Sequence, residues 1–339
     1  MAGLFDAFEI KNLQLKNRVM VSPMCQYMAE EDAVANDWHI VHYGSFALGG
    51  PALVMTEATA VEARGRISVH DLGIYDDRHM EPLRKLVEFN HRHGSKMGIQ
   101  MAHAGRKAIV PEPIIAPSAI AFSDKYPEPL EMTKEHMQEV LRAYRQATKR
   151  ALDVGFDVIE IHAAHGYLLH EFLSPVSNHR SDEYGLTREG RVRFVLEVME
   201  QVIDVVAGKI PVTVRVSASE YDCQGYSLDD VVYYCKRMEE IGIDAIDVSS
   251  GGNLPVAPSS YPGYQLPFAE AIKQAVHVPV LAVGMLDDPQ LAEHVIQSGK
   301  ADMIVVGRGF LRDKHWAHTA ALALGKQPQV PESYLRAYL

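Results

Sequence analysis

Eight short apolar runs, rich in β-branched residues, recur along the chain and predict buried β-strands. They lie at 18–23, 52–58, 96–103, 157–164, 212–218, 245–251, 278–284 and 302–309. Between them, stretches such as 134–154 and 188–207 carry apolar residues three and four positions apart, which is the periodicity of an amphipathic helix. Strands that alternate with helices favour a parallel sheet, and eight such units predict an α/β fold of the (α/β)8 TIM-barrel type.

The connections between these elements differ in length. The helix-to-strand connections are short and contain Gly155, Gly242 and Gly299, which suits the left-handed residue that often ends a helix. The strand-to-helix connections are much longer and lie at 104–133, 163–186 and 252–264. In a TIM barrel these extended loops lie on the C-terminal face, where catalytic residues collect. The loop lengths therefore place the expected site at that face.

The composition is that of an ordinary globular protein. Hydrophobic residues make up 47% of the sequence and charged residues 23%, so disorder is not indicated. A barrel of 339 residues can form a single domain, and no linker or low-complexity segment interrupts the chain. We therefore expect residues 1–339 to form one domain, with residues 4–16 as a short N-terminal cap over the bottom of the barrel.

Charge and cysteine content narrow the function classes. Lys and Arg number 33 against 44 Asp and Glu, a formal net charge of −11, which disfavours nucleic acid and anionic membranes as partners. No run approaches the length of a membrane span, and the N-terminus lacks the pattern of a signal peptide. Cys25, Cys223 and Cys235 form an odd set with no close pairing. A cytoplasmic location is expected.

Glycines and an arginine close the last two predicted strands. Barrels often bind phosphate at this place, with bare backbone N–H groups and a positive charge. Gly284 ends the seventh run, and Gly307 and Arg308 end the eighth. The alternative is a tight turn followed by a surface arginine. The phosphate interpretation predicts a phosphorylated cofactor.

Two histidines, His162 and His165, follow the fourth run and precede Tyr167. They allow three interpretations. Two imidazoles could ligate zinc, although the pair lies at a strand end, has no cysteine nearby in sequence and forms no HExxH motif, so no metal site is expected. They could be satisfied by neighbouring backbone groups. They could also donate N–H groups to an oxygen that gains negative charge, with Tyr167 as a proton donor beside them.

Other polar residues at the strand ends have open interpretations. Arg215 lies inside the apolar run "VTVRVSA", where an unpaired charge is costly, so it needs an anionic partner. That partner could be Glu160, Glu57 or an electron-rich ring that becomes negative on reduction. Gln100 could bond the edge of a heterocycle or be a satisfied buried amide. Cys25 could be a small buried hydrophobe.

The motifs together resemble a known family. They are "SPMCQYMA" (22–29), "EATAV" (57–61), "GRIS" (65–68), "QMAHAGRKA" (100–108), "HAAHGYLLHEFLSPVSNHRSDEYG" (162–185), "VRVSASEYD" (214–222) and "VGRGFLRD" (306–313). Their order over nearly the whole chain is similar to the Old Yellow Enzyme family of FMN-dependent ene-reductases. The match is closest to the bacterial branch that contains NADPH dehydrogenases and xenobiotic reductases.

The resemblance implies a set of cofactor contacts. The positions that match FMN-binding residues of the family are Ser22, Pro23, Met24, Cys25, Ala58, Gln100, Arg215, Gly284, Gly307 and Arg308. In the family Arg215 would lie beside the pyrimidine end of the flavin and favour the anionic reduced ring. Cys25 would tune the flavin potential and contact the substrate.

The resemblance also implies a reaction. His162 and His165 would bind the activating oxygen of an α,β-unsaturated carbonyl or nitro compound, and Tyr167 would protonate its α-carbon after flavin N5 delivers hydride to the β-carbon. Tyr27 and Lys107 would line the substrate pocket. NADPH or NADH would be the hydride donor.

In this branch an arginine near the C-terminus reaches the neighbouring subunit's site. Arg336, in "SYLRAYL", is the candidate, which predicts a homo-oligomer; the alternative is a solvated tail. One departure from the family pattern is "DEYGL" (182–186), where a second glycine is usual, so a locally altered loop is expected at Leu186. The segment "SNHRSDEYG" is interpreted as a structural brace.

Other functions remain as alternatives. A dihydroorotate-dehydrogenase-type FMN barrel would use a Cys or Ser base, which the paired histidines do not suit. A zinc-dependent barrel hydrolase would need a bound metal, and a ligand-binding barrel would be colourless and would not oxidise NADPH.

Overall fold

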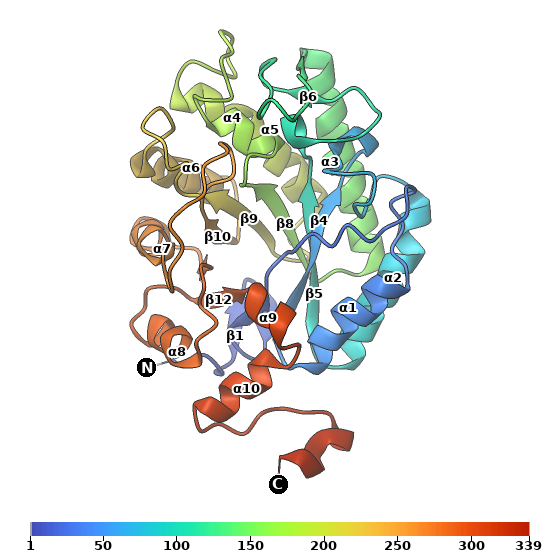
Figure 1. Cartoon of the computed structure of the whole chain (residues 1–339), viewed down its shortest axis with the longest axis vertical. Helices are drawn as coiled ribbons and strands as arrows, with labels where there is room; N and C mark the ends of the chain where they lie inside the picture. The colour runs from blue at the N-terminus through green and yellow to red at the C-terminus, as the bar shows by residue number, and fades with distance from the viewer. Residues whose placement is uncertain (1, 339) are drawn as a thin grey trace.

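The centre of the molecule is a closed barrel of parallel strands, shown by a computed structural model that describes residues 2–338 (Figure 1). In these residues the barrel has eight strands: β3 (Val19–Val21), β4 (Leu53–Ala60), β5 (Lys96–Ala102), β8 (Val158–Ala163), β9 (Val212–Ser217), β10 (Ala245–Ser249), β11 (Val280–Ala282) and β12 (Met303–Val306). The barrel closes where β12 pairs with β3, with Val305 opposite Met20. Each strand overlaps one predicted run, and only β4 extends beyond its run, to Ala60, so the predicted TIM-barrel class is confirmed.

Helices alternate with the strands along the chain. The longer ones are α1 (Asp37–Leu48), α2 (Met80–Arg92), α3 (Lys134–Val154), α5 (Arg188–Val206), α6 (Leu228–Glu240), α7 (Leu266–Lys273), α8 (Pro289–Gln297) and α10 (Trp316–Ala323). Helix α3 begins after Thr133, whose hydroxyl accepts from the backbone N–H of His136, and it ends at Gly155 with φ of 99°. In the described part of the chain, no helix combines the length and the apolar character that a membrane crossing requires.

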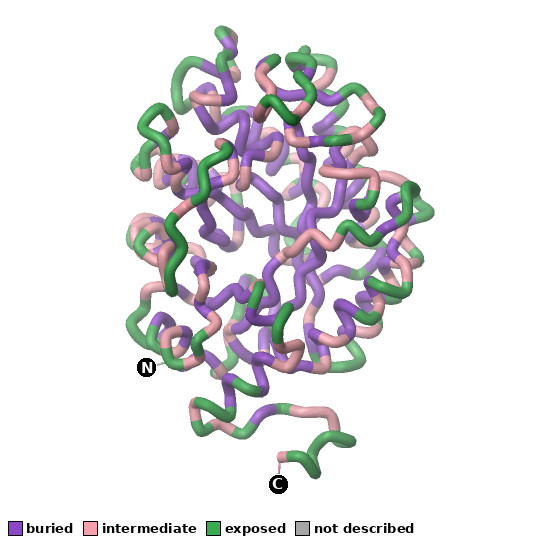
Figure 2. Tube along the Cα trace, in the orientation of Figure 1, coloured by how far each residue is buried: buried purple, intermediate pink, exposed green. Residues whose placement is uncertain are grey.

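The strand residues divide between two environments. On β8, Ile159 and Ile161 belong to the apolar core that the strands share with the helices. Glu160 and His162 alternate with them, and successive side chains of a strand point to opposite faces. Both polar side chains are therefore directed into the barrel, where they are buried. Figure 2 shows the buried strands at the centre and the exposed residues around them.

The N-terminal segment closes one end of the barrel. Strands β1 (Phe8–Ile10) and β2 (Leu13–Leu15) form an antiparallel hairpin. Ile10 and Leu15 are buried in an apolar cluster that includes Met303, at the start of β12. The expected cap over the bottom of the barrel is confirmed.

The long loops on the opposite face contain short elements. Loop 104–133 contains η3 (Gly105–Lys107), β6 (Ile115–Ala116) and β7 (Leu130–Glu131), and α4 (Leu168–Leu173) lies in loop 163–186. Arg180 joins these two loops by donating to the backbone oxygens of Pro117 (3.1 Å) and Met132 (2.6 Å). This agrees with the interpretation of the segment around Arg180 as a brace.

Leu186 lies where an altered loop was expected, and it adopts the left-handed conformation that glycine favours. Its φ is 57°, and 70% of its surface is exposed. A left-handed residue other than glycine costs about 1–2 kcal/mol. We therefore expect Leu186→Gly to raise the melting temperature, with a gain in stability of about 1 kcal/mol. Thermal unfolding followed by circular dichroism measures it.

The matched control is Val41→Gly, because Val41 is equally exposed but lies in the interior of helix α1. Glycine in a helix interior is about 0.8–1.0 kcal/mol less favourable than alanine, so this control is expected to lower the melting temperature. A decrease for both variants would contradict the assignment of strain to Leu186.

The chain ends in an arm, defined as residues 325–338, that projects from the body beyond α10 (Figure 1). Residues Glu332–Ala337 form the short helix η4 within it. Tyr334 and Leu335 of this helix are exposed.

Candidate active site

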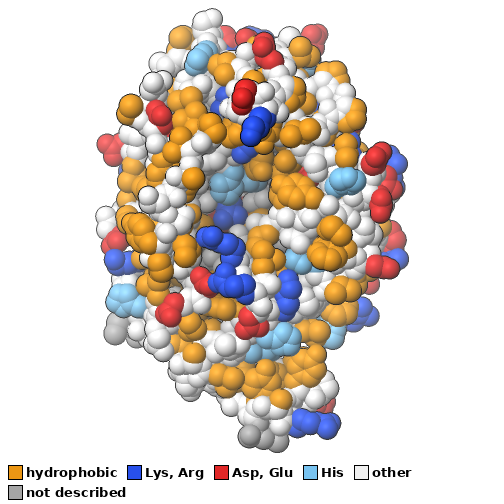
Figure 3. Space-filling view, in the orientation of Figure 1, with side chains coloured by type: hydrophobic (Ala, Val, Ile, Leu, Met, Phe, Trp, Pro, Cys, Tyr) orange, Lys and Arg blue, Asp and Glu red, His pale blue; other side chains and the backbone are white. Residues whose placement is uncertain are grey.

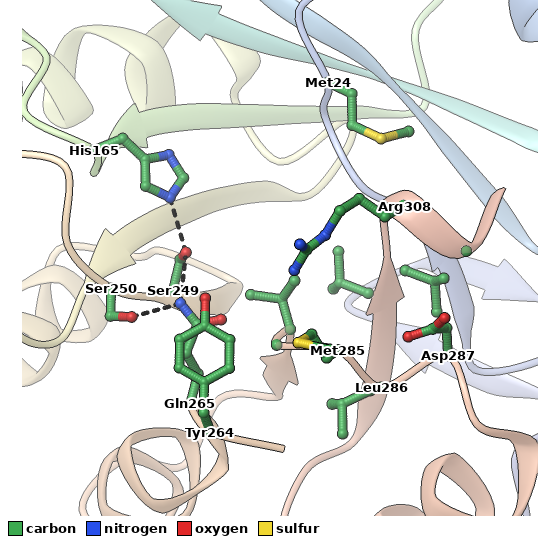
Figure 4. A pocket seen from close by; sticks show the side chains of 16 residues that line it. Met24, His165, Ser249, Ser250, Tyr264, Gln265, Met285, Leu286, Asp287 and Arg308 are labelled. Atoms are coloured by element: carbon green, nitrogen blue, oxygen red, sulfur yellow. Dashed lines mark hydrogen bonds between the residues drawn. The ribbon is translucent and has the colours of Figure 1, made fainter. Parts of the chain in front are cut away.

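A cavity of about 230 Å³ opens beside the C-terminal ends of β10, β11 and β12 (Figure 4). Four residues predicted to bind the cofactor line it: Met24, Gly284, Gly307 and Arg308. His165 also reaches it. Figure 3 shows the hollow on this face, with histidine and basic side chains at its floor.

The glycines and the arginine fit a phosphate group. A side chain at Gly284, where φ is 122°, would come within 2.9 Å of Gln265 Oε1, so the backbone is bare there by necessity. Arg308 is exposed and makes no hydrogen bond or ion pair with another residue of the described chain. Its side chain extends into the cavity (Figure 4). An unpaired guanidinium beside bare backbone suits a phosphate oxygen.

The remaining predicted cofactor residues lie next to the cavity, at the ends of the first three barrel strands and on β9. Ser22 precedes Pro23 and Met24 in the loop after β3, and a side chain built at Gly307 would lie 3.5 Å from Ser22 Cβ. Ser22 Oγ accepts a hydrogen bond from Arg215 at 3.2 Å. Ser22 therefore links Arg215 to the wall of the cavity.

Gln100 and Ala58 are opposite one another on β5 and β4. Gln100 is buried, and its amide nitrogen donates to Glu160 Oε1 at 2.8 Å. A protein side chain therefore accepts from the amide nitrogen of Gln100, in agreement with the interpretation of Gln100 as a satisfied buried amide.

The anionic partner of Arg215 within the described chain is Asp247, which corrects the carboxylate candidates Glu57 and Glu160 taken from the sequence. Arg215 Nε lies 3.2 Å from Asp247 Oδ2, and the two residues are opposite one another on β9 and β10. Glu57 instead accepts from the Tyr43 hydroxyl at 3.0 Å. Glu160 forms no direct ion pair with Arg215 in the described chain. Burial raises the pKa of Glu160 to about 8, and the charge of Arg215 only partly opposes this shift.

The two imidazoles and the tyrosine come together at the end of β8. The ring centroids of His162 and His165 are 5.1 Å apart, and those of His162 and Tyr167 are 5.0 Å apart. His165 Nδ1 lies 3.3 Å from His162 Nε2, and His165 Nε2 lies 2.8 Å from Ser249 Oγ (Figure 4). His162 Nδ1 is buried and has no partner among residues 2–338.

The protonation states of this group follow from burial. Burial, assisted by the charge of Arg215, holds the pKa of His162 and of His165 well below its usual value, so both rings are neutral. Burial also raises the pKa of Tyr167 well above its usual value, so the phenol keeps its proton. A neutral imidazole has one N–H donor, and the protonated phenol is a competent acid.

Cys25 and Tyr27 lie two residues apart on the loop after β3. Burial, with the charges of Asp71 and Glu57, raises the pKa of the Cys25 thiol to about 12. The thiol is therefore protonated at neutral pH and is a poor base. Tyr27 is half-exposed and is not among the residues that line the cavity.

Lys107 joins two of the long loops. Its ammonium donates to the backbone oxygens of His165 (2.9 Å) and Gly252 (3.0 Å), and it lies 5.0 Å from the centre of the Tyr167 ring. Burial lowers the pKa of Lys107 to about 8. Lys107 thus lies at the site as predicted, and its contacts hold the backbone that carries His165.

Arg336 lies in η4 on the exposed arm and is not part of the cavity. Within the described chain it forms no hydrogen bond or ion pair. Any contact of Arg336 with a site therefore requires a second copy of the chain.

The sequence reasoning missed two residues of the site. Asp247 lies inside the apolar run 245–251, so the argument applied to Arg215, that a charge in a buried strand needs a partner, could have found it. Gln265, at the start of α7, lines the cavity within hydrogen-bond distance of the Ser249 and Ser250 hydroxyls. No local sequence pattern predicts Gln265 as a site residue, because its position at the cavity depends on the path of the long loop before α7.

Metal ligation was one of the three interpretations of the histidine pair. Among the residues that the structure describes, no group of three or more His, Cys, Asp or Glu side chains is arranged to hold a metal ion. His162 and His165 therefore have no third protein ligand in this part of the chain.

The chain is similar in sequence to flavin oxidoreductases. Residues 3–327 match the NADH:flavin oxidoreductase / NADH oxidase family. An NADPH dehydrogenase of Geobacillus thermodenitrificans is 47% identical over 336 residues, covering 99% of this chain and 98% of that protein. An NADPH dehydrogenase of Listeria monocytogenes is 46% identical over 339 residues, covering 100% of both.

Solved structures show the same fold. Morphinone reductase has a TM-score of 0.82 at 24% identity and covers 97% of this chain and 91% of its own. A 2-naphthoyl-CoA reductase has a TM-score of 0.90 at 23% identity over 96% of this chain and 52% of its own.

Proposed function

Because the chain belongs to the NADH:flavin oxidoreductase / NADH oxidase family, we propose that it is an ene-reductase that uses NADPH to reduce activated C=C bonds. The family match confirms the predicted resemblance to Old Yellow Enzymes, the FMN cofactor and the oxidoreductase class. The acceptors proposed are α,β-unsaturated carbonyl and nitro compounds.

The residues around the cavity would hold FMN in two parts. The phosphate would be bound by Gly284, Gly307 and Arg308, because the glycines leave backbone N–H groups accessible and the guanidinium of Arg308 has no partner in the described chain. The ring would be held by Ser22, Pro23, Met24, Cys25, Ala58, Gln100 and Arg215. Bound FMN supplies a two-electron carrier, which takes hydride from NADPH and gives it to the β-carbon of the acceptor.

His162 and His165 would bind the activating oxygen of the acceptor through their N–H groups. The oxygen gains negative charge as hydride arrives, and fixed donors in a dry site stabilise that charge. In the structure His165 bonds Ser249 and faces His162, so both rings can donate to one oxygen after His165 turns away from Ser249. Lys107 holds the backbone oxygen of His165, which fixes the point about which its side chain turns.

Tyr167 would give its phenolic proton to the α-carbon. The Tyr167 ring lies beside His162. The raised pKa keeps the phenol protonated, so that it can donate its proton when the α-carbon of the acceptor becomes basic. The main support for the proposal is that two neutral imidazoles and a protonated phenol lie together next to a cavity that suits FMN. Tyr27 and Cys25 would contact the substrate.

The alternatives find less support. A dihydroorotate-dehydrogenase-type reaction needs a basic side chain, and a thiol whose pKa is about 12 does not provide one at neutral pH. A zinc-dependent hydrolase would need ligands beyond the two histidines. No observation favours either as a second candidate.

We further propose that residues 1–339 form one domain and that the chain is a cytoplasmic homo-oligomer, a dimer or tetramer, in which Arg336 reaches the neighbouring site. The exposed arm and the unpaired Arg336 support this arrangement. The three cysteines are free thiols, as suits a reducing compartment.

Anaerobic turnover with NADPH and 2-cyclohexenone tests the function. We expect one NADPH to be consumed for each cyclohexanone formed, measured by absorbance at 340 nm and by gas chromatography. NADPH oxidation without a saturated product would contradict the ene-reductase proposal, while leaving a flavin oxidoreductase of other specificity.

A further inference from the structure

Two carboxyl groups and one guanidinium are buried together inside the barrel, and only one of the carboxyl groups pairs directly with the guanidinium. Glu160, Arg215 and Asp247 are at most 4% exposed. Arg215 Nε lies 3.2 Å from Asp247 Oδ2, and Glu160 has Gln100 as its hydrogen-bond donor. Glu160 Oε2, both oxygens of Asp247 and Arg215 Nε have no hydrogen-bond partner in residues 2–338, so the contact between Arg215 and Asp247 is an ion pair and not a hydrogen bond. With two carboxyl groups and one guanidinium, the cluster is short of positive charge.

A proton makes up this shortage. If both carboxyl groups were ionised, the cluster would carry a net charge of −1 in a dry interior, which is costly. Burial, followed by the charge of Asp247, raises the pKa of Glu160 to about 8, and burial raises the pKa of Asp247 against the opposing effect of Arg215. One proton is thus held by the pair at neutral pH, and it belongs to both groups.

The cluster also reaches the cofactor region. Arg215 donates to Ser22 Oγ at 3.2 Å, and Ser22 lies beside Gly307 in the wall of the cavity. Arg215 is the residue expected at the pyrimidine end of FMN. If the ring gains a negative charge there, that charge would compete with the carboxyl pair for the positive charge of Arg215 and would favour protonation of the pair.

We propose that the Glu160–Asp247 pair takes up a proton from solvent when the flavin is reduced, and thereby sets the pH dependence of the flavin midpoint potential. Oxidised FMN accepts two electrons and one proton to give the anionic reduced ring, and the ionised pair accepts one further proton to become a neutral acid and a carboxylate. Glu160 is a positioning residue in this account, because it acts on the ring through Arg215. The inference rests on bound FMN and is independent of the acceptor.

The sign and the pH window follow from the charges. Negative charge on the ring raises the pKa of the pair, so the extra proton is taken up at pH values above the oxidised-state pKa, from about pH 8 upward. Below that pH the pair already holds its proton, and reduction adds none. Each extra proton makes the reduced-to-oxidised ratio change tenfold more per pH unit, about 30 mV for a two-electron couple.

Other titratable groups face the cluster. On β8, His162 lies two residues beyond Glu160, and His165 follows in the loop; both are neutral at these pH values. Lys107 acts on both imidazoles, and its own pKa is also near 8. From β5 the facing residue is Gln100, which does not titrate. The experiment therefore has to distinguish proton uptake by Lys107 from proton uptake by Glu160.

The test is a redox titration of the FMN-loaded protein from about pH 6 to pH 10, with wild type and Glu160→Gln compared. We expect the wild-type slope to steepen above about pH 8 by a further tenfold per pH unit, and Glu160→Gln to keep the shallow slope throughout. Flavin content measured beforehand shows that FMN is bound. Equal slopes in the two proteins, or a wild-type slope that never steepens, would overturn the proposal.

The matched control is Glu171→Gln. Burial raises the pKa of Glu171 to about 8 as well, but its charged neighbours are Arg106 and Lys107, with no contribution from Arg215. This variant is expected to behave like wild type. A shallow slope in Glu171→Gln would show that the effect is not specific to the pair, and would overturn the assignment.

A second measurement does not depend on the folding of Glu160→Gln. When NADPH reduces the flavin, its hydride carries both electrons and the proton of the ring, so any proton lost from the solution goes to the protein. With a pH indicator in weak buffer, we expect up to one proton taken up per flavin at about pH 8.5, and none at about pH 6.5. The uptake should persist in Lys107→Met; its loss in that variant, or its absence in wild type, would reject the pair as the proton acceptor.

Discussion

Replacing His162 with alanine is expected to lower the turnover of an enone about a hundredfold or more, while FMN remains bound. Removing one fixed donor to a developing oxyanion typically costs about 2.7–4 kcal/mol. His162 is neutral and buried, and its Nδ1 has no partner in the described chain, so its donor capacity is not used up by the fold. Stopped-flow oxidation of the reduced flavin by 2-cyclohexenone measures the effect.

Two further variants separate binding of the oxygen from loss of a buried ring. His162→Asn retains an N–H donor and should recover part of the rate. His79→Ala removes a fully buried imidazole that bonds the backbone of Asp32 and Asp76 away from the site, so it should lower stability without slowing enone reduction. Wild-type rates in His162→Ala would show that the imidazole does not bind the acceptor.

Tyr167→Phe is expected to slow the oxidation of reduced flavin by enones by about 10²–10⁴-fold, which is the usual contribution of a positioned acid. Oxidation by a quinone should change little, because a quinone accepts electrons without protonation of carbon. The phenylalanine keeps the ring that packs against His162 and below Lys107. The two acceptors are compared in single-turnover experiments on the same preparation.

The pH dependence provides an independent check of Tyr167. Because burial holds its pKa well above the usual value, the phenol stays protonated as pH rises through 10. The tyrosine-dependent part of the rate should therefore not decline at moderately alkaline pH. An equal loss with enone and quinone would remove Tyr167 from the role of proton donor.

The fold was predictable because local pattern and tertiary environment agree in it. Strands such as β8 are apolar and β-branched because one face packs on helices, and helix α3 carries its start and stop residues, Thr133 and Gly155, in the sequence. The loop lengths then indicated the correct face of the barrel. The motif resemblance supplied the cofactor, and the residue roles proposed here come from the same resemblance.

What the sequence did not reveal depends on contacts between distant segments. The partner of Arg215 is Asp247, 32 positions away on the neighbouring strand, and β-strand register rather than motif brings them together. Likewise, the His165 side chain could bond Ser249 or an acceptor, and the choice depends on the surrounding loops. The role of Arg336 depends on a second chain. Pairing across strands, side-chain orientation and assembly therefore required the structure.

FMN at the barrel mouth, with His162 and His165 binding an oxyanion beside it, is tested most directly by the absorption spectrum of the purified protein during titration with a para-substituted phenol. We expect flavin bands at the start and a saturable long-wavelength charge-transfer band as the phenolate binds, weakened in His162→Ala. A colourless protein that takes up no added FMN, or a flavoprotein that gives no such band, would contradict this arrangement.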